Sequence, residues 1–191
     1  MSGSTQPTDA ELVEAVLRNR NAYAQVVNRY ERVLTRYLNR LLGPRGGAAA
    51  DVLQDVFIKA YLNLNDYDRS RPFSPWIYRI AHNEAMSHLR RNRTEPQPLD
   101  SADAELILER LAADDDPAEI LLRKRADHAV RAAVSDLEVK YRDVLVLRYL
   151  EEKSYDEIAD ILHMPPGTVA TLIARGLKKL KSPLELSWGK A

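Results

Sequence analysis

The sequence predicts an all-α protein with two small helical domains joined by an acidic linker, the C-terminal domain containing a helix-turn-helix. Apolar residues recur at helical spacing in two separate blocks, and no strand-like alternation is evident. A stretch that contains prolines and many acidic residues separates the two blocks. We therefore expect domains at residues 1–92 and 117–191, with the linker at 93–116.

A capping box predicts the start of the first helix, and a long run of regularly spaced apolar residues predicts the second. Thr8 and Glu11 have the spacing of a capping box, in which each side chain satisfies the other residue's backbone N–H, and they open the first helix. A longer helix is predicted over 21–42, where apolar residues recur every three or four positions. Glycines and a proline within 43–47 end it.

Two more helices complete the first block. One covers about 49–64, and a loop follows over 65–73. Ser74 and Pro75 then start a fourth helix that runs to about Arg91, because serine caps helices and proline fits the first turn. The expected buried side of the third helix consists of Leu53, Val56, Phe57, Ala60, Tyr61 and Leu64.

The second block predicts four helices, of which the last two form a helix-turn-helix. Ser154 and Glu157 make a second capping box, and Thr168 is expected to cap the last helix after a tight turn. In such a motif the second helix enters the major groove of DNA. The expected helix ranges are 117–136, 139–150, 154–162 and 168–181.

The outward face of the last helix carries hydroxyl and basic side chains suited to DNA. Thr171 and Arg175 could reach base edges, while Lys178, Lys179 and Thr168 could contact phosphates. The alternative is a helical hairpin whose basic face is merely solvated, which the agreement of caps, turn and charge disfavours.

Charge is distributed unevenly along a chain whose formal net charge is zero. Residues 69–93 hold six arginines and one glutamate, residues 95–119 hold nine acids and one arginine, and residues 167–181 hold four basic residues and no acid. The order basic, acidic, basic indicates two surfaces for nucleic acid with an acidic segment between them.

Aromatic and basic residues are mixed over 66–83, as in proteins that hold single-stranded DNA. Phe73 and Trp76 are more simply explained as core residues that close the loop over the helices. Periodicity does not decide between DNA contact and a solvated helix face for the remaining candidates. These are Arg71, Arg79, His82, Asn83, Arg90 and Arg91.

Several functional classes are excluded or disfavoured. The chain has no cysteine, which excludes disulfides, zinc–thiolate sites and cysteine nucleophiles. Its four histidines show no metal-ligand spacing and there is no glycine-rich phosphate loop, so we expect no metal, no cofactor and no enzymatic activity. The polar N-terminus and the lack of an 18-residue apolar run predict a cytoplasmic protein without membrane insertion.

Two groups of residues, in this order and at this separation, resemble conserved regions 2 and 4 of extracytoplasmic-function sigma factors, over about 10–91 and 117–181. The first group is Asp51, Gln54, Asp55, Phe57, Trp76, Ile77, Tyr78, Ile80, Ala81, Asn83, Arg90 and Arg91. The second is Arg142, Val144, Leu147, Arg148, Tyr149, Ser154, Tyr155, Glu157, Ile158, Ala159, Pro166, Gly167, Thr168, Val169, Arg175, Gly176 and Leu177.

The resemblance implies a factor that brings RNA polymerase core to promoters, through the β′ clamp and the β flap. The loop before Trp76 would trap a flipped base of the −10 element, Asn83 and its neighbours would read the opened strand, and the second domain would bind the −35 duplex. The linker would thread the polymerase channels, and an anti-sigma factor would be a further partner. The resemblance places Asp51, Gln54, Asp55 and Phe57 on the polymerase-binding helix.

Two other functions stay open at this point. A DNA-binding regulator that never contacts polymerase would explain the second block but leave the 51–91 block without a purpose. A protein–protein adaptor with a degenerate DNA-binding fold is the other, since Ala170 and Thr171 stand where many family members have lysine and serine.

Overall fold

The computed structural model describes residues 6–42, 48–92, 100–112 and 137–188, and every regular element in these ranges is helical. The fold is all-α, as predicted. Contacts divide the chain into two compact units, Met1–Glu95 and Pro96–Ala191. None of the described helices is long and apolar enough to cross a lipid bilayer.

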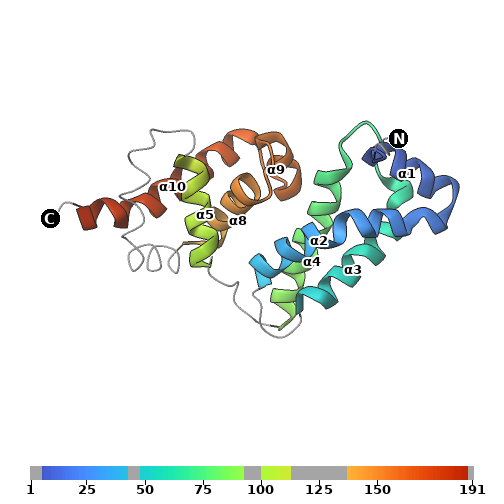
Figure 1. The fold of residues 1–191 in the computed structure, drawn as a ribbon, viewed down its shortest axis with the longest axis horizontal. Coiled ribbons are helices and arrows are strands. Elements are labelled where there is room, and N and C mark those ends of the chain that lie inside the picture. The colour runs from blue at the N-terminus through green and yellow to red at the C-terminus, as the bar shows by residue number, and fades with distance from the viewer. Residues whose placement is uncertain (1–5, 43–47, 93–99, 113–136, 189–191) are drawn as a thin grey trace, which may run out of the picture. The chain divides into compact units, whose positions relative to one another are not determined.

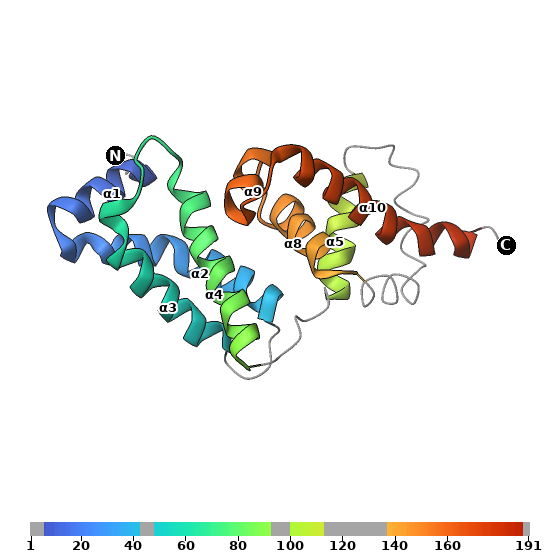
Figure 2. The same cartoon turned by 180° about the vertical axis from the view of Figure 1, so that it is seen from behind.

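The first unit is a bundle in which α2, α3 and α4 pack against one another, with α1 beside them (Figures 1 and 2). Its core is formed by aliphatic and aromatic side chains of α1, α2 and α4 together with small and aliphatic residues of α3. The elements are α1 Asp9–Arg18, η1 Arg20–Ala22, α2 Tyr23–Leu42, α3 Ala48–Leu62, η2 Leu64–Asp66 and α4 Phe73–Asn92.

The helix starts in this unit are partly as predicted. The capping box is confirmed, because the Thr8 side chain accepts from the Glu11 N–H and the Glu11 carboxylate accepts from the Thr8 N–H. The prediction that Ser74 caps the fourth helix is wrong, because α4 already begins at Phe73 and Ser74 lies inside its first turn. Pro75 also lies in that first turn, where its missing N–H has no cost.

The buried side of α3 differs from the predicted one. Val56 and Ala60 are fully buried as expected, but Leu53, Phe57 and Tyr61 are only half-buried. The physical reason is that α2 covers one edge of this apolar stripe and leaves the other edge open. That open edge becomes a groove.

The second unit contains the predicted helix-turn-helix. Figure 1 shows α10 lying across α8 and α9, and α10 packs against both. The helix expected over 117–136 lies outside the described residues. The elements are α5 Ser101–Ala112, α8 Val139–Leu145, the π-helical stretch η3 Val146–Leu150, α9 Tyr155–Leu162 and α10 Pro166–Trp188.

Part of the stretch expected as a linker is a helix that packs within the second unit. Ala104 and Ile107 of α5 are fully buried, and α5 contacts η3. At its end, Arg110 Nη1 donates to the Tyr149 carbonyl over 2.5 Å and lies 2.7 Å from a Glu152 carboxylate oxygen. Helix α5 is thus held in the second unit both by buried apolar side chains and by an ion pair.

The core of the second unit includes an ion pair that the sequence did not reveal. The Arg142 guanidinium donates to Asp143 Oδ1 from Nη2 over 2.7 Å and from Nε over 3.0 Å. Both residues are buried within α8. Two charges removed from water in this way depend on one another, because either alone would be strongly unfavourable.

Candidate nucleic-acid and protein-binding surfaces

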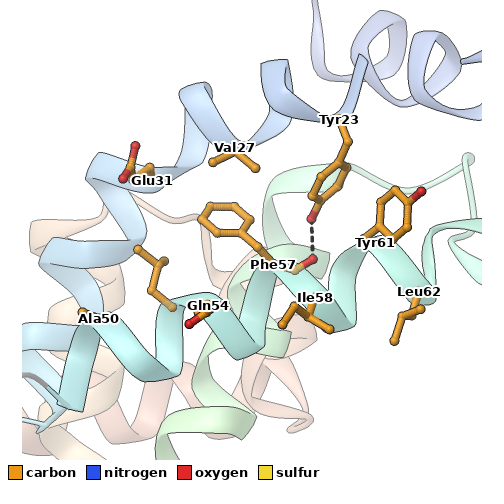
Figure 3. Close-up of a pocket in the computed structure, with 10 residues that line it drawn as sticks. Tyr23, Val27, Glu31, Ala50, Gln54, Phe57, Ile58, Tyr61 and Leu62 are labelled. Atoms are coloured by element: carbon orange, nitrogen blue, oxygen red, sulfur yellow. Dashed lines mark hydrogen bonds between the residues drawn. The ribbon is translucent and has the colours of Figure 1, made fainter. Parts of the chain in front are cut away.

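An open groove of about 530 Å³ lies between α2 and α3, and we call it the α2–α3 groove (Figure 3). It is mostly apolar, with the Gln54 amide and the Glu31 carboxylate among its few polar groups. The residues that line it are Tyr23, Val27, Glu31, Ala50, Leu53, Gln54, Phe57, Ile58, Tyr61 and Leu62.

Two of the lining residues are large apolar side chains that face solvent. Ile58 is 49% exposed and Leu62 is 67% exposed. Sequence reasoning missed both, although their spacing of four residues on α3, away from the buried stripe, was a usable signal. An exposed apolar pair beside a groove is typical of a surface that binds another protein.

Contacts across the top of the groove fix its shape. The Tyr23 hydroxyl donates to the Phe57 carbonyl over 2.7 Å, as Figure 3 shows. The Tyr23 and Tyr61 rings meet edge to face with centroids 5.0 Å apart. Burial raises the pKa of Tyr23 above its ordinary value, so its hydroxyl stays protonated and keeps donating.

The residues expected to bind polymerase lie on or beside this groove. Gln54 and Phe57 line it, Phe57 being half-buried rather than a full core residue. Asp51 and Asp55 are exposed on α3. The structure therefore brings the four residues onto one helix, where apolar groups are flanked by carboxylates.

The loop between η2 and α4, residues 67–72, is named here the aromatic–basic loop. Residues 68–72 are exposed. The Tyr67 ring lies 5.4 Å from the Phe73 ring and 5.2 Å from the Trp76 ring, measured between centroids. Phe73 is buried, which confirms its expected role in the core, whereas Trp76 is only half-buried.

Three of the candidate residues on α4 lie on one face of that helix. Arg79, Asn83 and Arg90 are separated by four and seven positions, which places them on one face. Asn83 and Arg90 are exposed and Arg79 is half-buried, so this face is accessible to a ligand.

The other candidates of the first unit lie around that face. His82 is half-buried, and its Nδ1 is 3.1 Å from the Tyr37 hydroxyl. Arg91 is exposed at the end of α4. Arg71 is exposed in the aromatic–basic loop, with Nε 3.6 Å from an Asp68 carboxylate oxygen.

A hollow of about 360 Å³ lies beside Asn83, and we call it the Asn83 hollow. Lys59 and Glu84 form an ion pair at its wall, with 2.5 Å between Nζ and Oε1. The Trp76 ring and the amide of Asn83 offer it an aromatic and a hydrogen-bonding surface, the groups that hold an unstacked base. Its lining residues are Lys59, Asn63, Asp66, Trp76, Ile80, Asn83 and Glu84.

The turn of the helix-turn-helix depends on an unusual backbone conformation. The capping box of Ser154 and Glu157 starts α9, as predicted. His163 ends it with φ 52° and ψ 50°, the left-handed region, and thereby turns the chain toward α10. The expected cap at Thr168 is wrong, because α10 begins at Pro166 and Thr168 lies within its first turn.

The candidate residues of α10 fall into two groups. Thr168, Thr171, Arg175 and Lys178 are exposed, and the Thr171 hydroxyl donates to the Gly167 carbonyl over 2.8 Å. Lys179 is also exposed, but it is engaged in contacts within the unit. Its Nζ lies 3.3 Å from a Glu138 carboxylate oxygen and 5.4 Å from the centre of the Tyr141 ring.

Close packing holds the exposed face of α10 in place. Gly176 is buried where α10 meets α8, and a Cβ there would lie 3.1 Å from Leu145 Cδ1 and 3.2 Å from Tyr141 Cβ. Glycine thus allows the two helices to approach, which leaves Arg175 and Lys178 on the opposite, solvent side.

Known proteins match this chain over both units. The profile of sigma-70 region 2 matches residues 26–95, and that of sigma-70 region 4 matches residues 127–180. The chain is 31% identical over 170 residues to the ECF RNA polymerase sigma factor SigW of Bacillus subtilis, covering 87% of this chain and 90% of that one. It is 32% identical over 186 residues to the RNA polymerase sigma-H factor of Pseudomonas aeruginosa, covering 95% and 96%.

Solved structures show the same fold. CnrH, solved in complex with the cytosolic domain of CnrY, has a TM-score of 0.63 and 25% identity, with coverage of 94% of this chain and 99% of CnrH. The sigma factor RpoE of Bartonella quintana, solved with the anti-sigma factor NepR, has a TM-score of 0.60 and 18% identity, covering 85% and 96%.

Proposed function

As a member of the extracytoplasmic-function sigma factors, this chain is an RNA polymerase sigma factor, and we propose how its surfaces divide the work of initiation. The first unit binds core polymerase and the opened −10 element, and the second unit binds the −35 duplex. A sigma factor is a transcription initiation factor and not an enzyme, so binding free energy alone has to drive promoter opening.

The α2–α3 groove is the observation that carries this proposal. A protein that only bound DNA would have no use for Ile58 and Leu62 in solvent beside exposed Asp51 and Asp55, since carboxylates repel phosphates. Apolar groups ringed by charge fit a protein partner. We assign the groove and Asp51, Gln54, Asp55 and Phe57 to the β′ clamp.

The −10 role is assigned to the aromatic–basic loop and the adjoining face of α4. Unstacking a base costs a few kcal/mol, and holding it against an aromatic ring returns about 1–3 kcal/mol. The Asn83 hollow offers Trp76 for stacking and Asn83 for hydrogen bonding. Five side chains of the loop and of α4 serve the phosphates: Arg71, Arg79, His82, Arg90 and Arg91.

The −35 role is assigned to the exposed face of α10. Thr171 and Arg175 face the base edges, while Thr168 and Lys178 contact phosphates. Lys179 reaches a phosphate only if it leaves Glu138, so its share in binding is smaller. We assign contact with the β flap to the same second unit.

The organisation of the chain supports three further assignments. Residues 1–92 and 117–191 act as the two recognition domains, and 93–116 joins them on polymerase, although α5 inside this stretch packs on the second unit and leaves only 93–100 as the connection. An anti-sigma factor is a partner in the cytoplasm, in keeping with the anti-sigma complex known for a similarly folded sigma factor. Such a partner covers the α2–α3 groove and thereby excludes polymerase.

In vitro transcription with purified core polymerase tests the proposal. The wild-type chain should give run-off transcripts from its promoter with no other factor. Ile58→Asp should weaken core binding about tenfold or more, because it removes an apolar side chain from the interface and adds a charge. The matched control is Gln25→Asp, an exposed position on the side of α2 away from the groove.

The outcomes separate the candidate functions. Loss of core binding by Ile58→Asp alone supports the proposal, whereas equal core binding by both variants refutes the assignment of the groove. A chain that binds duplex DNA but gives no transcripts with core is a regulator of another kind. A chain that binds neither is an adaptor.

A further inference from the structure

We propose that Asp9 on the N-terminal helix α1 is a positioning residue for promoter opening, which holds the aromatic–basic loop in the shape that receives the −10 strand. The inference rests on the proposed −10 role of the first unit. It concerns a helix that carries none of the candidate binding residues.

Asp9 uses both carboxylate oxygens to join α1 to α2. Its Oδ1 lies 2.8 Å from Arg29 Nη1, and its Oδ2 accepts from the Tyr30 hydroxyl over 2.6 Å. Arg29 also donates to the Pro7 carbonyl. The side chains of Arg29 and Asp9 are 26% and 31% exposed, so this pair is sheltered and stronger than a surface ion pair.

Tyr30 transmits the position of α1 to the start of α4. Its ring lies 5.5 Å from the Phe73 ring at an interplanar angle of 70°, an edge-to-face contact. The centroid of the Phe73 ring in turn lies 5.3 Å from that of the Trp76 ring and 5.4 Å from that of the Tyr67 ring. Since Tyr30 and Phe73 are both buried, a shift of the Tyr30 ring displaces Phe73 and the rings beside it.

The segment after α1 secures the other end of the same loop. Arg20 donates to the Tyr61 carbonyl over 3.2 Å and to the Asn65 side-chain oxygen over 3.3 Å. Its guanidinium also lies 4.8 Å from the centre of the Tyr61 ring. The N-terminal part of the chain therefore has contacts on both sides of the loop. Arg20 binds Tyr61 and Asn65 before the loop, and Asp9 acts through Tyr30 on Phe73 after it.

Contacts within the loop also hold it in shape. The Tyr67 hydroxyl donates to the Arg71 carbonyl, and Asp68 accepts from the Ser70 N–H and hydroxyl. Burial, and then the negative charge of Asp9, raises the pKa of Tyr67.

Open-complex formation by Asp9→Asn holoenzyme tests the inference, measured by permanganate reactivity of the −10 thymines well below the unfolding temperature. Loss of charge-assisted contacts should reduce open complexes about tenfold, with core and −35 binding within about twofold of wild type. The matched control is Glu14→Gln, which breaks the exposed Glu14–Arg18 pair of the same helix and should change nothing.

A double-mutant cycle separates positioning from general support of the fold. Tyr30→Phe keeps the ring and removes only the hydroxyl. If Asp9 acts through Tyr30, the combined variant should open promoters no less well than Asp9→Asn alone. Additive losses, or a fall in core binding in proportion to the fall in opening, would overturn the inference.

The remaining outcomes are equally decisive. Normal opening by Asp9→Asn, while wild type is active, refutes the positioning role alone. A wild-type chain that opens no promoter with core refutes the proposed function beneath it. If Asp9→Asn does not fold, Tyr30→Phe gives the same readout, and its normal opening counts against the inference.

Discussion

The surfaces that we propose for binding differ in chemical composition between the two units. The first unit exposes apolar groups in the α2–α3 groove and charged groups in the aromatic–basic loop, over a core of aliphatic and aromatic side chains. The second unit exposes a polar face of α10 over a core that includes the Arg142–Asp143 pair. Docking on a protein needs apolar surface and capture of an unstacked base needs an aromatic ring with basic groups for the phosphates, whereas contact with a duplex needs placed charges.

Breaking one ion pair in each unit tests this difference most strongly. Arg142→Ala should destabilise the second unit by about 3–5 kcal/mol, because Asp143 would stay buried without its partner. Lys59→Ala should cost the first unit less, because Glu84, although its side chain is only 9% exposed, lines the open Asn83 hollow and can be reached by water once Lys59 is removed.

Thermal unfolding of the full chain measures both effects. In a Trp188→Phe background the one tryptophan left is Trp76, so its emission follows the first unit, while far-UV circular dichroism follows both. If Arg142→Ala and Lys59→Ala lowered the stability of their units equally, the contrast between the two cores would be rejected.

A second test compares two glycines of α10. Gly176→Ala should destabilise the second unit by about 1–2 kcal/mol, because the added methyl crowds Leu145 and Tyr141. Gly167→Ala should be neutral or stabilise by up to about 1 kcal/mol, because nothing lies within 4 Å of the new Cβ and alanine favours helix. Chemical denaturation gives both values, and a neutral or stabilising effect of Gly176→Ala would contradict the close contact between α10 and α8.

The smallest expected effect concerns the capping box at the start of α1. Hydrogen bonds from Thr8 lower the pKa of Glu11 below its usual 4.5. A lowered pKa in the folded state means that Glu11 stabilises α1 above pH 4.5 and loses this effect as the pH falls through the lowered value. The difference in melting temperature between wild type and Glu11→Gln should therefore shrink on acidification, and a constant difference from pH 7 to 3 would contradict it.

Local patterns in the sequence were sufficient for much of the fold. Both capping boxes, the long period of α2 and the helix-turn-helix follow from short-range chemistry, and the structure has them where predicted. Helix starts at Phe73 and Pro166 were misplaced, because Ser74 and Thr168 are good caps by type and the chain enters each helix one or two residues earlier.

What the sequence did not show depends on contacts between distant residues. The α2–α3 groove is open because α2 covers only part of α3. The spacing of apolar residues within α3 gives no information about how far α2 covers it. Arg142 and Asp143 have the composition of a solvated surface, and only the packing of the second unit buries them. The link from Asp9 to Tyr30 crosses 21 positions and has no local signature.

Under the proposed function, the docking of α5 limits how far apart the −10 and −35 elements can lie. With α4 ending at Asn92 and α5 starting at Ser101, only residues 93–100 are left to span from one domain to the other. An extended chain advances about 3.3–3.6 Å per residue, so this tether reaches at most about 30 Å while Arg110 stays on Tyr149 and Glu152. Release of α5 lengthens the tether by its twelve residues, so the strength of this contact bears on which spacer lengths the protein accepts.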